Sequence, residues 1–381
     1  MVKDIRTTLE RLQADAVRRN FLKAVSLKAA LSRMGFVQAD PIRSPARAQD
    51  LILRHRVRDY CAGDLERAYP RLNIEEDVLY AYGFLTRENW RLLHPRDSSG
   101  LSDLERKVLD IVGQLGRAHP RELDKHLGRE RTLNAWGGYS KATTHALQRL
   151  HYRGLLRIVR RDEGIRIYQL NPPMDEHLSP QERLRQIVLL LAKIFAPSPL
   201  PSLQKTVQRL RYAAPALDRK SGILGTLLRS GELESDEFDG VRYIWPAGGL
   251  TRRPSEGAVR FLAPFDPLVW DRLRFEHLWG WRYRFEAYTP LEKRQLGYYA
   301  MPLLWRDAVI GWANVAVKGG KLTAKLGFVE YRPTDAEFSR ELDREVELIR
   351  DFLGAANQYR VTYAKTPNIR LTHAARQANE G

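Results

Sequence analysis

The strongest constraint on the fold is a run of three helices followed by two short strands in the middle of the chain. Apolar residues recur at helical spacing over residues 104–115, and a break at residues 116–120 separates them from a second short helix. A third helix, expected over residues 140–152, ends at Gly154. Two strand-like stretches then flank a turn at residues 162–164. Three helices and a hairpin in this order are typical of a winged helix.

A second, less regular copy of this pattern follows the first. Its three helices are expected at residues 182–194, 203–212 and 223–228. A proline-rich break at residues 197–201 follows the first helix, and the hairpin turn is expected at residues 239–240. Helices expected over residues 5–18 and 26–34 fit a further unit of the same kind. Winged helices often bind DNA, because a helix fits the major groove, but others bind proteins.

The C-terminal third of the chain is expected to be rich in β-structure. From about Gly257 the sequence becomes aromatic and strand-like, and Tyr283 and Phe285 alternate with charged residues at the period of a strand. Three further strands are expected at residues 298–304, 309–317 and 322–329. A hairpin turn at residues 318–321 joins the last two. An amphipathic helix over residues 335–355 closes this lobe, and we expect the polar tail beyond it to fray.

These patterns predict an α+β fold with tandem winged helices, three in number, followed by a β-rich C-terminal lobe. The expected domains begin with an N-terminal winged-helix-like domain at residues 1–100 and two further winged helices at residues 101–175 and 176–250. The β-rich lobe follows at residues 251–335, and the C-terminal helix and tail at residues 336–381. Tandem modules supply several contacts from one chain, so a monomer is expected.

The charge of the chain indicates a polyanionic partner. Its 381 residues include 63 Lys plus Arg against 46 Asp plus Glu, which gives a formal net charge of +17. Nucleic acid and an anionic membrane surface both fit this charge. No apolar run reaches the roughly 18 residues of a membrane helix, and the single cysteine, Cys61, fits a reducing compartment. We therefore expect a cytoplasmic, nucleoid-associated protein with no membrane partner.

Arginine is concentrated on the hairpin of the first winged pattern. Five arginines stand there against two acids: Arg153, Arg157, Arg160, Arg161 and Arg166 against Asp162 and Glu163. Arginines that contact DNA phosphates would make the affinity depend on salt. The alternative is a hairpin whose charges are simply solvated.

A short segment near the N-terminus carries the residues best suited to catalysis. Gln38 and Asp40 are two positions apart, a spacing at which side chains point the same way on an extended chain. Pro41 favours extended geometry at Asp40, so the amide and the carboxylate can converge on one water molecule. Spacing alone favours a structural role instead, in which Gln38 caps a turn. Asp40 would then pair with Arg43 or Arg47.

In combination, these features resemble the YcaQ/AlkZ family of winged-helix DNA glycosylases over nearly the whole chain. Besides the tandem winged pattern, the resemblance is carried by residues 36–40, 46–48, Trp136, Lys141, Gly154, Leu156, 264–272, 292–294 and 297–299. Gln38 and Asp40 match the Gln-x-Asp branch of the family, which includes enzymes that unhook interstrand crosslinks. The chain departs from many relatives at residues 79–85, where it lacks a histidine that they carry after an aromatic residue.

The resemblance implies a monofunctional DNA glycosylase, without metal or cofactor, that removes alkylated purines from double-stranded DNA. It implies Gln38 and Asp40 as the catalytic pair. Ionised Asp40 would stabilise positive charge on the sugar and orient or deprotonate water, while the Gln38 amide holds that water. Ordinary glycosidases need a second carboxyl to protonate the leaving group. A ring-alkylated purine is already cationic, so one carboxylate can suffice.

Basic and aromatic residues are expected to contact DNA or to support the residues that do. They are Arg43, Arg47, Arg54, Arg56, Trp136, Lys141, Arg157, Arg160 and Arg161. For the first four, a phosphate contact and a supporting role are both open. Trp136 precedes two glycines, so a loop that meets DNA bases and a packed corner are equally compatible with it.

Two other classes of protein compete with a glycosylase. A non-catalytic winged-helix regulator needs no Asp40 and releases no base, whereas a glycosylase leaves an alkali-labile abasic site. A protein-interaction scaffold would show little salt-dependent affinity for DNA. A hydrolase triad is not supported, because four histidines stand without an evident Ser or Cys partner: His119, His145, His151 and His277.

Overall fold

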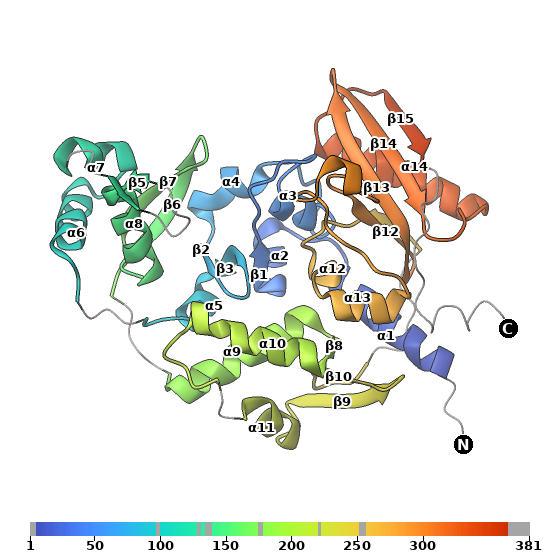
Figure 1. The fold of residues 1–381 in the computed structure, drawn as a ribbon, viewed down its shortest axis with the longest axis horizontal. Helices are drawn as coiled ribbons and strands as arrows, with labels where there is room; N and C mark the ends of the chain where they lie inside the picture. The colour runs from blue at the N-terminus through green and yellow to red at the C-terminus, as the bar shows by residue number, and fades with distance from the viewer. Residues whose placement is uncertain are drawn as a thin grey trace. The chain divides into compact units, whose positions relative to one another are not determined.

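A computed structural model of the chain describes residues 5–96, 100–127, 131–133, 139–173, 178–219, 222–250 and 257–364 (Figure 1). Contacts between Cα atoms divide the chain into two compact units. The larger unit comprises Met1–Asp64, Val188–Val207 and Leu224–Gly381, and the smaller unit comprises Leu65–Ile187 and Gln208–Ile223. Within the described residues, we find no helix that is both long and apolar enough to span a membrane.

The smaller unit contains the helices and hairpin predicted for the first winged pattern. The helices are α6 (Asp103–Leu115), α7 (Pro120–Leu127) and α8 (Ala142–Tyr152), and the hairpin strands are β6 (Leu156–Asp162) and β7 (Ile165–Leu170). α6 begins with a capping box, in which Ser102 and Glu105 exchange side-chain and backbone hydrogen bonds. α6 packs against α8 and β7, and α8 packs against β6. A short hairpin of β4 (Arg131–Leu133) and β5 (Tyr139–Lys141), between α7 and α8, was not predicted.

A second hairpin in the smaller unit was also not predicted. β2 (Ile74–Val78) pairs antiparallel with β3 (Tyr82–Thr86). The short helices before and after it are α4 (Asp64–Ala68), η1 (Tyr69–Arg71) and α5 (Arg87–Arg91). Thr86 caps α5 by accepting a hydrogen bond from the backbone N–H of Asn89. β2 carries three consecutive acids, Glu75, Glu76 and Asp77, and all three are buried.

The second winged pattern has its predicted helices and hairpin. They are α9 (Pro180–Phe195), α10 (Leu200–Ala213), α11 (Ile223–Arg229), β9 (Leu233–Phe238) and β10 (Val241–Pro246), with β8 (Ser198–Pro199) added to the sheet in the order β8-β10-β9. The proline-rich break is shorter than expected, because α10 already begins at Leu200. The boundaries between the two units fall within α4, α9, α10 and α11. The number of winged helices and the five domain boundaries stay predictions.

A five-stranded sheet forms the β-rich part of the larger unit. Its strands follow the chain order β11 (Val259–Phe261), β12 (Met301–Trp305), β13 (Ala308–Lys318), β14 (Lys321–Phe328) and β15 (Tyr359–Tyr363). The pairs are antiparallel except that of β14 with β15, which is parallel and was not predicted. The turn between β13 and β14 is confirmed: Gly319 and Gly320 both have positive φ, as a tight hairpin turn requires. The expected fraying tail lies outside the described residues from residue 365 onward.

Helix α14 (Ala336–Phe352) packs against β11 of this sheet. Asp335 caps it by accepting a hydrogen bond from the backbone N–H of Phe338. The helix predicted to close the lobe is therefore confirmed. Its inward-facing apolar residues are buried: Phe338, Leu342, Val346, Ile349 and Phe352.

The strand expected around Tyr283 and Phe285 is wrong. The aromatic stretch after β11 forms two short helices, α12 (Pro267–Trp270) and α13 (Arg272–Trp279), and the residues that follow them are irregular. Asp266 and Asp271 cap these helices with side-chain hydrogen bonds, and these caps explain why the segment turns rather than extends. The strand expected to start at Tyr298 begins only at Met301.

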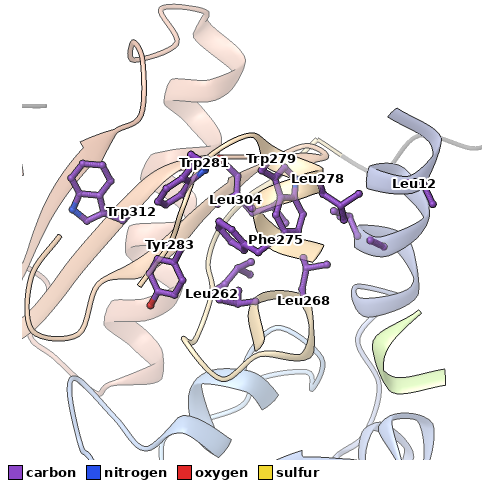
Figure 2. Close-up of a cluster of buried hydrophobic side chains, with 14 of the residues drawn as sticks. Leu12, Leu262, Leu268, Phe275, Leu278, Trp279, Trp281, Tyr283, Leu304 and Trp312 are labelled. Atoms are coloured by element: carbon purple, nitrogen blue, oxygen red, sulfur yellow. Dashed lines mark hydrogen bonds between the residues drawn. The ribbon is translucent and has the colours of Figure 1, made fainter. Parts of the chain in front are cut away.

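The aromatic residues of this region fill a core instead of a strand face. Figure 2 shows Phe275, Trp279, Trp281, Tyr283 and Trp312 gathered in one buried cluster. Phe275 meets the rings of Trp279 and Trp281 edge-on, with centroids 4.8 and 5.2 Å apart. This packing fixes the chain between α13 and β12, which carries residues of the candidate site.

The N-terminal helices of the larger unit are confirmed as α1 (Ile5–Asn20) and α2 (Leu27–Met34). α2 starts at the cap Ser26 and ends at Gly35, whose φ of 72° is the left-handed conformation that closes a helix. β1 (Phe36–Gln38) follows directly, and α3 (Ala48–Leu53) packs against it. The segment between β1 and α3 holds the candidate catalytic residues.

Candidate functional site

Gln38 is the last residue of a fully buried strand. β1 starts immediately after the left-handed Gly35, so the strand leaves α2 without a connecting loop. The Gln38 side chain is buried, and its Oε1 atom has no hydrogen-bond partner among the described residues of the protein. An unpaired buried amide oxygen is costly, and in native proteins it usually has a functional or solvent-related explanation.

Asp40 lies just beyond the strand, in a turn. Strand β1 ends at Gln38, so Asp40 is not part of a strand, and its carboxylate accepts a hydrogen bond from the backbone N–H of Ile42 at 2.9 Å. Pro41 between them has no N–H with which to continue a ladder. The carboxylate is half-buried, and burial raises its pKa against the opposing effect of the Ile42 hydrogen bond.

No cation neutralises Asp40 in the described part of the chain. Arg43 is exposed, and Arg47 lies at the N-terminus of α3; neither forms an ion pair with Asp40 there. The structural role favoured by spacing alone, a pair with one of these arginines, is therefore not observed. A half-buried carboxylate with no partner cation is available to a positively charged substrate.

Two polar residues near this segment were missed by the sequence interpretation. Gln49 on α3 is buried, and its Oε1 atom lacks a partner among the described residues. The Tyr299 hydroxyl, in the loop before β12, is also buried and unpaired there. Burial and the negative charge of Asp40 both raise the pKa of the Tyr299 phenol, so the two side chains are close enough to interact. Gln49 follows no pattern that would single it out in the sequence, and Tyr299 was named only among the residues that carry the family resemblance, without a role.

Arg54 and Arg56 are buried in ion pairs, which favours the supporting role left open for them. Arg54 pairs with Glu345 of α14 and donates to the carbonyl of Phe261 at 3.0 Å. Arg56 donates to both carboxylate oxygens of Asp266 at 2.8 and 3.0 Å. These contacts fix α3 against the cap of α12 and the sheet, and they leave little guanidinium surface for a phosphate.

Two of the three hairpin arginines expected to contact DNA are paired with buried acids. Arg157 approaches Glu75 at 2.9 Å, and Arg161 donates to Glu76 at 2.8 Å. Arg160 pairs with Asp162 at 2.8 Å, and both of these side chains are largely exposed. Of the three, Arg160 is thus the one most accessible to DNA.

The third acid of β2, Asp77, is surrounded by donors from its own unit. Its carboxylate receives hydrogen bonds from Trp90 at 2.9 Å and Arg96 at 3.1 Å, and His94 lies 3.2 Å away. Burial alone would raise its pKa, but the hydrogen bond of His94 and the charge of Arg96 lower it to about 2. Asp77 therefore carries its charge in a structural role.

The remaining predicted DNA contacts lie on the segment between α7 and α8. Lys141 pairs with Asp124 of α7, which also accepts a hydrogen bond from Thr143 at 2.8 Å. Trp136 lies outside the described residues. Both alternatives for Trp136, a loop that meets DNA bases and a packed corner, therefore stay open.

Comparison with known proteins identifies the class. The model of the AlkZ-like DNA glycosylase family matches residues 31–352, a span that includes Gln38 and Asp40. The chain therefore belongs to this family of DNA repair enzymes, and the resemblance read from the sequence is confirmed. Membership implies a hydrolase that acts on DNA.

A solved structure has a similar fold. The DNA glycosylase AlkZ of Streptomyces sahachiroi aligns with a TM-score of 0.60 at 14% sequence identity, over 93% of this chain and 99% of that one. At this identity the likeness supports the fold, and it confirms the predicted α+β class.

Proposed function

We propose that this glycosylase hydrolyses the N-glycosidic bond of alkylated purines in double-stranded DNA, with water held by Gln38 and Asp40. The observation that carries the proposal is the state of these two residues. Gln38 presents a buried amide oxygen with no partner among the described residues, and Asp40 presents a carboxylate with no cation. A water molecule would give Gln38 the hydrogen bond that it lacks, and a positively charged sugar would give Asp40 the cation that it lacks.

The chemistry of the substrate explains why one carboxylate is enough. A purine alkylated on its ring is cationic, so it leaves with the electrons of the glycosidic bond without first being protonated. The sugar then carries positive charge, which ionised Asp40 stabilises. Water attacks C1′ and gives its proton to Asp40, while the Gln38 amide keeps the water in line.

The same groups favour a monofunctional enzyme. A lyase step needs an amine nucleophile that forms a Schiff base with the sugar, whereas an amide and a carboxylate can only activate water. We propose that the product is an intact abasic site, that the enzyme acts as a monomer, and that interstrand crosslinks joined through alkylated purines are a second class of substrate. The alternative of a non-catalytic regulator has no support from the family.

The test is release of free base from duplex DNA that carries a methylated guanine, followed by alkali cleavage. Asp40→Asn keeps the shape of the side chain and removes its charge, so we expect the single-turnover rate to fall at least about a hundredfold with DNA affinity retained. Asp110→Asn, an exposed position on α6, is the matched control and should retain the wild-type rate. Equal rates for wild type and Asp40→Asn would contradict the proposal.

A crosslinked duplex separates the two substrate classes. Mustard-crosslinked DNA should be unhooked by wild type and not by Asp40→Asn if both substrates use the same water. Release of methylated base without unhooking would confine the enzyme to single-base adducts.

A further inference from the structure

Tyr299 is a buried tyrosine whose hydroxyl has no hydrogen-bond partner among the described residues. Tyr283, which is equally buried, shows the usual arrangement: its hydroxyl donates to the carbonyl of Ala300 at 2.7 Å. Buried tyrosine hydroxyls normally find such a partner. The exception at Tyr299 therefore needs an explanation that the protein alone does not supply.

The loop that carries Tyr299 is held rigidly. The carboxylate of Glu286 accepts hydrogen bonds from the backbone N–H groups of Gln295, Leu296 and Gly297, at 2.8 to 3.1 Å. Asn314 donates to the carbonyl of Leu296 at 2.7 Å. These bonds fix the backbone of residues 295–297, two positions before Tyr299. The position of the Tyr299 ring is therefore set before any substrate binds.

Gly297 is required for this arrangement. Its φ of 122° lies in the region that favours glycine, and a Cβ atom there would lie 2.4 Å from Oδ1 of Asn314. The Tyr299 ring itself packs edge-on against Phe285, with centroids 5.3 Å apart. The phenol is thus braced on one side by an aromatic ring.

The free hydroxyl lies within the electrostatic reach of Asp40. Burial and the Asp40 carboxylate both raise the pKa of the phenol, so Tyr299 stays protonated and can act as a hydrogen-bond donor. Gln38 Oε1 and the Asp40 carboxylate are acceptors. Two acceptors and one donor complement a water molecule, which can donate two hydrogen bonds and has two lone pairs with which to accept.

We propose that Tyr299 is a positioning residue that donates a hydrogen bond to the water held by Gln38 and Asp40. The inference rests on the proposed function. With its two hydrogens directed to Gln38 and Asp40 and one lone pair accepting from Tyr299, the water keeps one lone pair for attack. Its oxygen bonds to C1′ as the glycosidic bond breaks, the electron pair leaves with the purine, and one proton passes to Asp40.

The test is single-turnover base release by Tyr299→Phe, which removes only the hydroxyl. We expect the maximal rate to fall between about tenfold and a hundredfold, because the water is no longer fixed in line, while the DNA concentration for half-saturation stays unchanged. Tyr298→Phe is the matched control: this neighbouring tyrosine is 42% exposed, and its loss should not change the rate. A thermal melt of each variant shows whether the loop remains folded.

The double variant Asp40→Asn with Tyr299→Phe tests whether the two residues act on one water. If they do, the double variant should be no slower than Asp40→Asn alone. Independent, multiplying losses would overturn the inference, as would weaker DNA binding with an unchanged maximal rate.

The rates of these variants test the role of Tyr299 separately from the proposed glycosylase function. A slow Asp40→Asn with a Tyr299→Phe as fast as wild type would refute the role of Tyr299 and leave the proposed function intact. Wild-type rates for both variants would refute the proposed function itself.

Discussion

The carboxylates of β2, in the smaller unit, and the carboxylate of Asp40, in the larger unit, have opposite surroundings. On β2 of the smaller unit, Glu75, Glu76 and Asp77 are almost fully buried, and arginines approach each of them: Arg157, Arg161 and Arg96. In the larger unit, Asp40 is half-buried and accepts one backbone hydrogen bond, with no cation among the described residues. The more deeply buried acids are thus the ones with partners.

This difference separates structural acids from a functional one. A buried charge that serves the fold needs a counter-charge from the fold, since an unpaired buried ion is strongly destabilising. A carboxylate that must stabilise positive charge on a substrate loses that capacity if an arginine already neutralises it. The acids of β2 are structural charges with counter-charges, whereas Asp40 is a carboxylate left available to a substrate.

The largest effect is expected from breaking a pair in the smaller unit. Arg161→Ala leaves Glu76 buried without its main partner and should lower the free energy of unfolding by about 3–5 kcal/mol. Arg160→Ala is the control, because Arg160 and its partner Asp162 are 41% and 44% exposed; we expect a change within about 0.5 kcal/mol. Urea denaturation measures both, and equal effects would show that the buried network does not stabilise the unit.

Acid should destabilise the smaller unit in two steps. Burial lowers the pKa of His151 from 6.5 to about 4, so stability falls as the pH drops through that window, where only the unfolded chain takes up the proton. Asp77, lowered from 3.8 to about 2, adds a second loss over that lower window. The first step is worth about 3 kcal/mol and the second about 2 kcal/mol. Unfolding free energies between pH 7 and pH 2 check this, and His151→Phe should flatten the first step.

The pH dependence of catalysis should reflect Asp40 and not the acids of β2. Because burial raises the pKa of Asp40 above its ordinary 3.8, the active ionised form is lost on the acid side at a pH above that value. Below this point, the single-turnover rate should fall about tenfold per pH unit. An acid limb centred below pH 3.8 would show that another group limits the rate.

The smallest effect concerns DNA binding. Arg43, three residues after Asp40, is exposed, whereas Arg157 forms an ion pair with Glu75. Arg43→Ala should weaken affinity for undamaged duplex and reduce the slope of log affinity against log salt by about 0.9, the value for one phosphate contact. Arg157→Ala should leave that slope unchanged. A reduced slope for Arg157→Ala would mean that the hairpin binds DNA in spite of its acids.

Much of the fold follows from local signals in the sequence. The helices of the first winged pattern carry apolar periodicity and a capping box. In the C-terminal sheet, the turn at Gly319 and Gly320 identifies the hairpin of β13 and β14. The acids of β2 were missed because three consecutive carboxylates do not resemble a buried strand. The β6 partner of Glu76, Arg161, lies 85 residues further along the chain, and periodicity carries no information about such pairs.

The candidate site was predictable only in part. Gln38 and Asp40 were identified by spacing and family resemblance, but the state that makes them candidates, an unpaired oxygen and an uncompensated charge, depends on tertiary structure. Tyr299, whose phenol pKa is raised by burial and by the charge of Asp40, lies more than 250 residues further along the chain. The strand expected at Tyr283 failed for a local reason, since the caps Asp266 and Asp271 start short helices.

The most direct test of the contrast measures two quantities, base-release rate and free energy of unfolding, for Asp40→Asn and for Glu76→Gln. Both replace a carboxylate with its amide. Asp40→Asn should lose at least about a hundredfold in rate and keep the stability of the wild type, whereas Glu76→Gln should lose stability and keep its rate while folded. An Asp40→Asn variant that unfolds as easily as Glu76→Gln, or that releases base at the wild-type rate, would contradict the central claim that Asp40 is the functional carboxylate.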